Sequence, residues 1–275
     1  MSKDRPPSVN SFLKWAGGKR WLVPELQRHL PTSFNRYIEP FLGGGAVFFA
    51  LRPTSATLSD LNRDLIELYQ VVRDHPQQLR ELLLDHEQKH TKDYYYSTRS
   101  DVPTAKLERA ARTLYLNRTC FNGLYRVNKK GEFNVPIGTK TTVVFPEEDF
   151  NAYSAALASA DLIVADFEEV IDDAEDGDLV YVDPPYTVAH NMNGFLKYND
   201  HIFSWSDQER LRSAISRAAE RGAMVIASNA NHDSIKDLYS GLGNHHEVTR
   251  HSVIAGPVAK RTPTSEVLMT FNLGS

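Results

Sequence analysis

The alternation of hydrophobic and polar stretches predicts strands that are each followed by a helix. A segment at 36–41 that ends in an apolar stretch predicts a strand. The three glycines at 43–45 predict a turn, and the apolar segment at 46–51 predicts a helix. The short apolar stretch at 56–58 predicts another strand, and the spacing over 62–72 predicts the helix after it.

The middle of the chain follows a helical pattern instead. Apolar residues recur at helical spacing from about 77 to 116, and an aromatic, basic stretch over 121–133 then carries a hairpin-like turn at 129–131. After residue 150 the strand–helix alternation returns. Strands are expected at 161–167, 179–182, 223–228 and 266–273, and a helix at 208–221. We therefore expect an α/β fold, interrupted by a mostly helical insert that carries a β-hairpin.

Composition and charge narrow the class of protein. The chain has 275 residues, 41% of them hydrophobic, and a single cysteine, Cys120, which excludes an internal disulfide framework. It has no apolar run of the roughly 18 residues that a membrane span needs and no apolar signal-peptide core, so we expect a cytoplasmic protein. The net charge of −4 does not suggest nucleic-acid binding. However, residues 104–140 hold eight basic and two acidic side chains, whereas residues 147–178 hold 12 acidic and no basic ones. The basic region is either a phosphate-binding surface or a solvated helix face.

The glycine turn and the next strand end suggest a nucleoside-containing cofactor. Gly43 and Gly45 lie where a strand gives way to a helix, so the backbone there can approach a ligand closely. Asp60 ends the next strand, where a carboxylate can accept hydrogen bonds from ribose hydroxyls. The turn is not a dinucleotide-binding fingerprint, because Phe48 takes the place of its third glycine. The alternative is a tight turn with a purely structural role.

The tetrapeptide Asp183-Pro184-Pro185-Tyr186 follows another apolar strand. The two prolines remove two N–H donors and leave carbonyl acceptors. Asp183 and the Pro184 carbonyl can accept the hydrogens of an amino group, and the Tyr186 ring can stack on a flat base. This combination suits transfer to an exocyclic amine of a nucleobase, with a structural turn as the alternative.

Residues 86–90 match the HExxH zinc motif through His86, Glu87 and His90. Their sequence neighbours are polar, so we expect a solvated helix end and no metal site. Cys120 lacks the Pro-Cys context of a cytosine-C5 methyltransferase nucleophile, and its position in the insert argues for a structural or DNA-proximal role.

Five segments in order resemble the Dam-type family of DNA adenine-N6 methyltransferases, which use S-adenosylmethionine (SAM). They are FLKWAGGKR from residue 12, YIEPFLGGGAVFF from 37, SDLNRDLI from 59, NRTCFNGLYRVNKKGEFNVPIG from 117 and DPPY from 183. The resemblance implies a Rossmann-like SAM-dependent methyltransferase core over 1–62 and 152–275, with a DNA target-recognition insert over 63–151. It also implies a cytoplasmic protein that is a monomer in solution, acts on double-stranded DNA and is associated with the nucleoid through that DNA.

The resemblance assigns further site residues. Those implied at the cofactor, besides Gly43 and Gly45, are Trp15, Ala16, Lys19, Phe41, Asp60, Asp166, Phe167 and Asp183. Those implied at GATC-containing DNA are Lys14, Phe121, Asn122, Leu124, Arg126, Lys129, Lys130 and Pro136. Some relatives carry tyrosine in place of Phe121, so stacking is kept and a hydroxyl contact is lost.

These assignments are chemically plausible. Arg126 can contact guanine in a bidentate manner, and Leu124 and Pro136 can pack on a thymine methyl group. Phe121 can fill the space that a flipped adenine leaves. Core packing is the alternative for Phe121 and Leu124. The alternatives for the whole protein are an amino-methyltransferase acting on another site, on cytosine N4 or on RNA, a non-catalytic DNA-binding relative, and a phosphotransferase.

Overall fold

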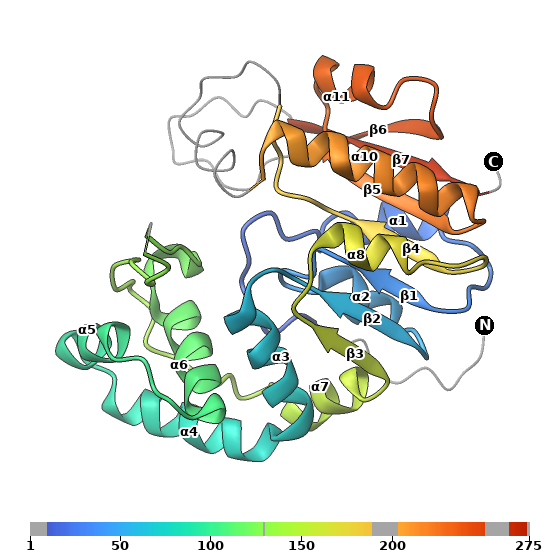
Figure 1. The fold of residues 1–275 in the computed structure, drawn as a ribbon. Coiled ribbons are helices and arrows are strands. Elements are labelled where there is room, and N and C mark those ends of the chain that lie inside the picture. Colours follow the sequence, from blue (N-terminus) through green and yellow to red (C-terminus); the bar gives the residue numbers. More distant parts are fainter. Residues whose placement is uncertain (1–9, 129, 189–202, 251–263, 274–275) are drawn as a thin grey trace. The chain divides into compact units, whose positions relative to one another are not determined.

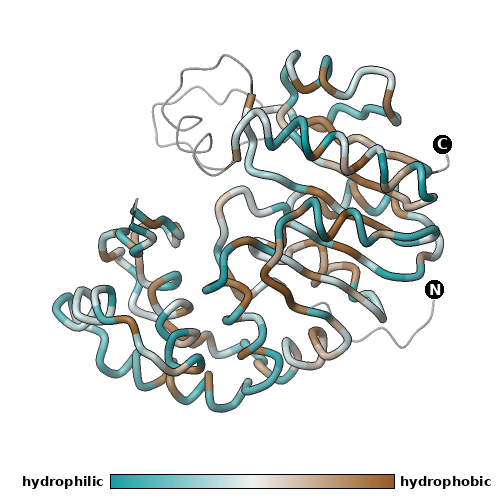
Figure 2. The backbone as a smooth tube through the Cα atoms, viewed as in Figure 1, coloured by the Kyte–Doolittle hydropathy of each residue, from teal (hydrophilic) through white to brown (hydrophobic). Residues whose placement is uncertain are grey.

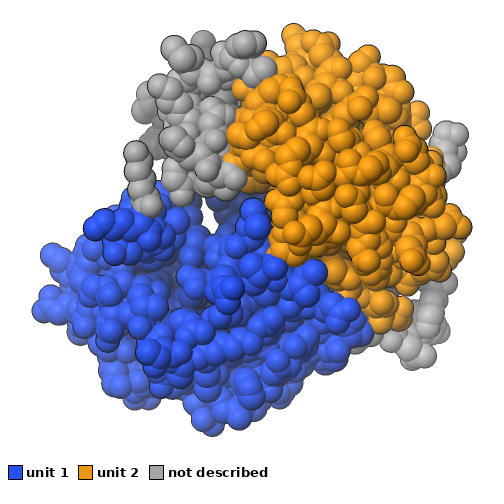
Figure 3. All heavy atoms as spheres, in the orientation of Figure 1, with its two compact units in different colours: residues 1–20, 42–52, 60–164 blue, residues 21–41, 53–59, 165–275 orange. Residues whose placement is uncertain are grey.

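The computed structural model describes residues 10–128, 130–188, 203–250 and 264–273. Two compact units divide the chain (Figure 3). Unit 1 comprises residues 1–20, 42–52 and 60–164, and unit 2 comprises 21–41, 53–59 and 165–275. These units are defined by contacts and do not test the functional division into 1–62, 63–151 and 152–275, which stays a prediction.

Unit 2 contains a mixed sheet of six described strands in the order β2-β1-β4-β5-β7-β6 (Figure 1). The strands are β1 Tyr37–Glu39, β2 Ala56–Ser59, β4 Leu179–Val182, β5 Met224–Ala230, β6 Asn244–Arg250 and β7 Thr264–Phe271. The first four in the sheet are parallel, β7 is antiparallel to β5, and β6 is antiparallel to β7. Tyr37 is opposite Leu179, and Ala227 is opposite both Val182 and Met269. The carboxyl ends of β1, β2, β4 and β5 therefore share one edge of the sheet, where α/β folds place their sites.

Helices α8 and α10 pack on one face of this sheet (Figure 1). The helices of unit 2 are α1 Val23–His29, α8 Phe167–Asp172, α10 Trp205–Glu220 and α11 Asp233–Leu238. Leu211 and Ile215 of α10 share a buried cluster with Val180 of β4 and Val225 of β5. Figure 2 shows the matching pattern, with hydrophobic residues along the central strands and hydrophilic ones on the outer side of the helices.

Arginines neutralise much of the acidic segment 147–178. Arg36 pairs with Asp178 at 2.8 Å and with Asp173, and Arg217 pairs with Glu168 and Asp172. Ion pairing thus explains how so many carboxylates lie close together along the chain.

Unit 1 is mainly helical and has an aromatic core. Its elements are α2 Ala46–Leu51, α3 Arg63–Asp74, α4 Pro76–Lys89, α5 Lys92–Ser100, α6 Lys106–Thr119, the 3₁₀ turn η1 Phe121–Gly123, α7 Phe150–Leu157 and the strand β3 Ala160–Ile163. The Phe12 ring lies 5.0 Å from the Tyr69 ring and 5.2 Å from the Tyr153 ring, which joins the N-terminal segment to α3 and α7. Among the described helices of both units, none is long and apolar enough to cross a membrane.

The predicted α/β class is confirmed, with local differences. The expected strand at 161–167 is wrong beyond Ile163, because Asp166 accepts the backbone N–H of Glu168 and caps α8, which begins at Phe167. The expected hairpin is reduced, among the described residues, to the bridges Val127–Phe133 and Cys120–Ile137. The helical stretch 77–116 is divided into α4, α5 and α6, and the pattern did not predict α1, α7, α11 or β6.

The HExxH segment is not the expected solvated helix end. The His86 ring stacks on Tyr115 at 4.7 Å, and burial lowers its pKa to about 4. Its Nδ1 lies 2.8 Å from the Tyr94 hydroxyl. The Glu87 carboxylate accepts the backbone N–H groups of Val143 and Val144. These residues join α4 to the rest of unit 1, and none of the described residues forms a cluster that could hold a metal ion.

We predict that Glu148→Gln destabilises the protein by about 3–5 kcal/mol, because it leaves a buried arginine unpaired. The side chains of Arg118 and Glu148 are each 4% exposed, and Arg118 Nη1 lies 2.7 Å from Glu148 Oε2. Urea unfolding measures the change. The control is Glu147→Gln at the exposed neighbouring carboxylate. Equal stability of the two variants would contradict the prediction.

Candidate functional site

The glycine turn between β1 and α2 is built around the side chains that pack on it. Gly43 and Gly45 have φ values of +45° and +61°. A Cβ atom on Gly43 would lie 2.7 Å from Trp15 Cδ1, and one on Gly45 would lie 2.8 Å from the Tyr69 hydroxyl. The positive φ values and the lack of space for a Cβ atom therefore both require glycine. The alternative interpretation, a tight turn with a purely structural role, is also supported by these two observations.

Asp60 holds the same turn. Its Oδ2 accepts the Gly43 N–H at 3.1 Å, and its Oδ1 accepts the Asn62 N–H at 2.9 Å. Burial raises the pKa of the Asp60 carboxyl, and these two donors oppose the rise. Each carboxylate oxygen keeps lone-pair capacity for a further donor. Asp60 can therefore support the turn and bind a hydroxyl at the same time.

The N-terminal segment presents residues of different exposure. Trp15 is half-buried, Ala16 is exposed and Lys19 is buried. The Trp15 ring stacks on Tyr125, with centroids 5.0 Å apart and planes inclined by 25°. Trp15 thus packs against the glycine turn and against the segment that follows α6.

In unit 2, the tetrapeptide 183–186 follows β4 with two of its side chains oriented by hydrogen bonds. The Ser228 hydroxyl donates to Asp183 Oδ1 at 2.8 Å. The Tyr186 hydroxyl donates to Glu266 Oε2 at 2.7 Å. Burial raises the pKa of Tyr186, as do the charges of Asp183 and Glu266, so Tyr186 stays protonated as a donor. Pro184 is buried, whereas Asp183 and Tyr186 are half-buried.

Phe41 and the start of α8 lie near the same edge of unit 2. The Phe41 ring stacks on Phe167 at 5.4 Å and meets Phe203 edge-on at 5.6 Å. Asp166 caps α8 and also accepts a hydrogen bond from Arg210 at 2.8 Å. Asp166 therefore has a structural role, and its expected role at the cofactor stays a prediction.

In unit 1, a loop over residues 121–136 exposes side chains that would otherwise be expected in a core. Phe121 is 52% exposed and Leu124 is 42% exposed, so the core-packing alternative is wrong for both. The Phe121 N–H donates to the Pro136 carbonyl at 2.9 Å, which brings the two ends of the loop together. Asn122 has φ +57° and is exposed, as are Lys130 and Pro136. Lys129 lies outside the described residues.

Basic and polar groups of this loop are held in defined positions. Arg126 Nε–H donates to Asn134 Oδ1 at 2.8 Å. The exposed Lys14 packs on the loop, since a Cβ on Gly123 would lie 2.6 Å from Lys14 Cδ. The neighbouring ammonium of Lys140 lowers the pKa of Lys14, and partial burial adds to this effect. Two adjacent ammonium groups favour an anion such as phosphate.

The sequence profile of a known family extends over most of these elements. It is described as D12 class N6 adenine-specific DNA methyltransferase, and it matches residues 15–254. The chain belongs to this family. The protein is therefore an adenine-specific DNA methyltransferase, and DNA is its substrate.

Individual relatives agree with the family profile. The type II methyltransferase M1.LlaDCHI of Lactococcus lactis subsp. cremoris is 37% identical over 96% of this chain and 95% of its own length. The DNA adenine methylase of Haemophilus influenzae is 33% identical, covering 94% and 93% of the two chains. That of Escherichia coli K12 is 32% identical, covering 100% and 98%.

The methyltransferase carries its expected site residues in three described groups, two in unit 1 and one in unit 2. Trp15, Gly43, Gly45 and Asp60 surround the glycine turn of unit 1, and the loop 121–136 brings together Lys14, Phe121 and Pro136. Phe41, Asp166, Phe167, Asp183 and Tyr186 belong to unit 2.

Sequence reasoning missed the partners of these residues. Ser228 and Glu266 orient the tetrapeptide, and Tyr125 stacks on Trp15. Leu61, 65% exposed directly after Asp60, was missed as well. The run of polar residues that ends β5 was a usable signal for Ser228, and an aromatic between Leu124 and Arg126 was one for Tyr125.

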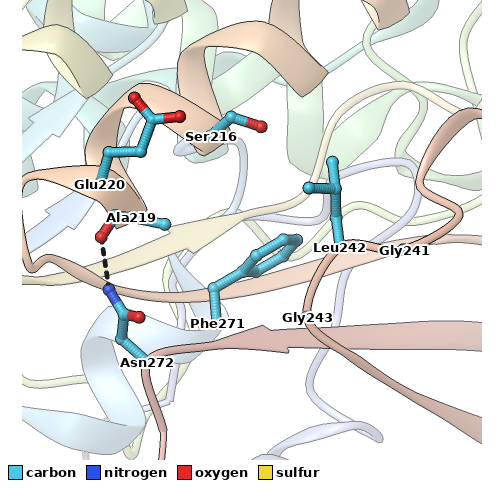
Figure 4. A pocket seen from close by; sticks show the side chains of 8 residues that line it. All are labelled: Ser216, Ala219, Glu220, Gly241, Leu242, Gly243, Phe271 and Asn272. Carbon is cyan, nitrogen blue, oxygen red and sulfur yellow. Dashed lines mark hydrogen bonds between the residues drawn. The ribbon is translucent and has the colours of Figure 1, made fainter.

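The methyltransferase also has a shallow pocket between α10 and the end of β7 (Figure 4). It is lined by Ser216, Ala219, Glu220, Gly241, Leu242, Gly243, Phe271 and Asn272. Phe271 pairs with Val225 near the start of β5, whereas Asp183 follows the end of the parallel neighbour β4. The pocket therefore belongs to the opposite edge of the sheet from the tetrapeptide and contains no expected site residue.

We predict that Gly43→Ala destabilises the methyltransferase by about 3 kcal/mol, because a positive φ and a steric clash with Trp15 act together. Gly241→Ala is the matched control, since Gly241 has φ +76° with no atom within 4 Å of the added Cβ. It should cost only about 1 kcal/mol. Thermal and urea unfolding compare the two, and equal losses would show that Trp15 yields freely.

Proposed function

We propose that this methyltransferase transfers the methyl group of SAM to N6 of an adenine that it flips out of double-stranded DNA, within the site GATC. The observation that supports this most is the exposure of Phe121 and Leu124 on one loop with Arg126 and Pro136. Large apolar side chains at such exposure suit contacts with bases rather than with a protein core.

Each side chain of the loop suits a different part of the target. Arg126 has its Nε–H on Asn134, and its two terminal nitrogens make no hydrogen bond to any described residue. That leaves the outer side of the guanidinium for guanine O6 and N7. Leu124 and Pro136 suit the thymine methyl group, and Phe121 suits the gap left by the adenine. Asn122, Lys14, Lys129 and Lys130 are proposed to contact DNA nearby.

The tetrapeptide suits the target amine. The N6 lone pair is delocalised into the adenine ring, so the amine is a poor nucleophile. Asp183 and the Pro184 carbonyl accept hydrogen bonds from the two N–H groups of the amine and favour a tetrahedral nitrogen. Tyr186 stacks on the base. Ser228 and Glu266 hold Asp183 and Tyr186 in place before the base arrives, which reduces the reorganisation during reaction. The proton leaves after the methyl group has moved, so Asp183 need not be a strong base.

The residues at the glycine turn fit the groups of SAM. Asp60 has acceptor capacity for ribose hydroxyls, and the exposed Leu61 beside it offers an apolar surface for a flat ring. When bound, SAM supplies a methyl group activated by a positively charged sulfur. The proposed cofactor residues are Trp15, Ala16, Lys19, Phe41, Gly43, Gly45, Asp60, Asp166, Phe167 and Asp183.

The main alternative is adenine methylation at another site. The adenine-specific family profile argues against cytosine N4. Single-base sequencing of N6-methyladenine on a plasmid from cells that express the chain, in a host without its own adenine methylation, tests the proposal. Methylation of the adenine in GATC supports it, and methylation confined to a different sequence contradicts the GATC assignment alone.

We predict that Asp183→Asn lowers the single-turnover rate of methyl transfer at least about a hundredfold, because an amide is a poorer acceptor and can place its NH2 toward the amine. The fold should persist. Asp161→Asn, at an exposed carboxylate of β3, is the control. A near-normal rate in a folded Asp183→Asn enzyme would exclude Asp183 from this role.

We predict that Arg126→Ala and Lys130→Ala differ in kind. Arg126→Ala should cost about 1–3 kcal/mol of discrimination at one G·C pair, because a base contact is lost. Lys130→Ala should weaken binding to all sequences and reduce the salt slope by about 1, as for a lost phosphate contact. Methylation of GATC and of its single-base neighbours at several salt concentrations separates the two. A uniform loss in Arg126→Ala would make Arg126 a backbone contact.

A further inference from the structure

Trp15 lies between two elements of unit 1 that the proposed function assigns to different ligands. On one side it fills the space over Gly43, within 2.7 Å of where a Cβ would stand. On the other side its ring stacks on Tyr125 at 5.0 Å. A shift of the indole therefore affects both the glycine turn and the loop 121–136.

Tyr125 is held in that stack from other directions. Its hydroxyl donates to Asp64 Oδ2 at 3.2 Å, near the start of α3. Its ring meets Phe133, on the other side of the loop, edge-on at 5.6 Å. In the chain it stands between Leu124 and Arg126, which are both exposed. Tyr125 thus cannot move without moving the side chains proposed to read DNA.

Asn117 forms a second connection between the same two segments. It is 1% exposed, its Oδ1 accepts the Lys14 N–H at 3.1 Å, and its Nδ2 donates to the Lys14 carbonyl at 2.8 Å. The same Nδ2 lies 3.4 Å from the Gly123 carbonyl. The backbone before Trp15 and the backbone before Leu124 are therefore fixed to one buried amide.

We propose that Tyr125 is a positioning residue that couples cofactor binding at the glycine turn to the arrangement of the DNA-reading side chains on the loop 121–136. The inference rests on the proposed function of these two elements. A cofactor that orders Trp15 also orders Tyr125, and through it Leu124 and Arg126. By thermodynamic linkage, target DNA must then strengthen cofactor binding by the same factor.

The test uses four variants of the full chain. Tyr125→Leu and Tyr125→Met remove the aromatic ring, and methionine keeps more of the side-chain length if leucine destabilises the fold. Tyr125→Phe keeps the stack on Trp15 and removes the bond to Asp64. Tyr96→Leu is the matched control, because Tyr96 is a half-buried tyrosine of α5 that contacts Tyr95 and Arg99 and lies outside the loop.

The measured quantity is the ratio of dissociation constants for a GATC duplex without and with saturating S-adenosylhomocysteine. We expect a ratio of about ten in the wild type, within the usual range for coupled sites. It should fall to about one in Tyr125→Leu and Tyr125→Met, and stay near the wild-type value in Tyr125→Phe and Tyr96→Leu. The binary affinities for duplex and for S-adenosylhomocysteine should change far less than the ratio. A merely structural role would lower both binary affinities and leave the ratio intact.

Two results would overturn the proposal: a wild-type ratio near one, or a wild-type ratio retained by folded Tyr125→Leu or Tyr125→Met. The proposed function is assessed separately, by wild-type methylation of the same duplex. If the wild type methylates another sequence, the GATC assignment fails, and the ratio is measured on a duplex carrying the sequence found. Loss of the ratio there would still support Tyr125.

Discussion

The placement of the N-terminal segment depends on two neighbouring side chains at the end of α6. Arg118 donates to the Phe12 carbonyl, and Asn117 binds both the N–H and the carbonyl of Lys14. Residues 12–14 lie in no helix or strand, so their backbone polar groups need partners of this kind once buried. Trp15 follows directly, and its packing over Gly43 determines where the glycine turn can lie. The arrangement of unit 1 thus depends on hydrogen bonds to two side chains on one helix.

The fold was predictable where local pattern and local chemistry agree. The limits of α2 and β4 match the expected 46–51 and 179–182, because a glycine turn and a polar tetrapeptide bound them in the sequence. The strand expected at 161–167 does not reach residue 167, because Asp166 caps the helix that begins there. The apolar residues around Asp166 did not indicate this helix start. The expectation of a solvated helix end at His86 is wrong for another reason. Its sequence neighbours are polar, but the Tyr115 ring that covers it comes from a different helix.

The candidate site could be proposed from sequence motifs, whereas the contacts within it could not. Asp60, Asp183 and Tyr186 are candidates because each follows an apolar strand. Spacing could not assign Ser228 and Glu266 to them as partners, since these two residues lie 45 and 80 positions away and are brought near by strand pairing. Asp60 also shows that a motif does not predict contacts. Its expected role concerned a ligand, and the structure adds the Gly43 N–H, a bond that no spacing rule indicates.

The exposure of Phe121 and Leu124 also bears on how such an enzyme changes over evolution. Substitutions at exposed positions usually alter stability by no more than about 0.5 kcal/mol. The exposed residues that we propose as base-reading can therefore be exchanged without compensating changes in the interior. Divergence in target sequence is then limited by selection for particular DNA sites, and only slightly by loss of folding stability. The buried supports, Asn117 and Arg118, have no such freedom, so new specificities would arise on an unchanged frame.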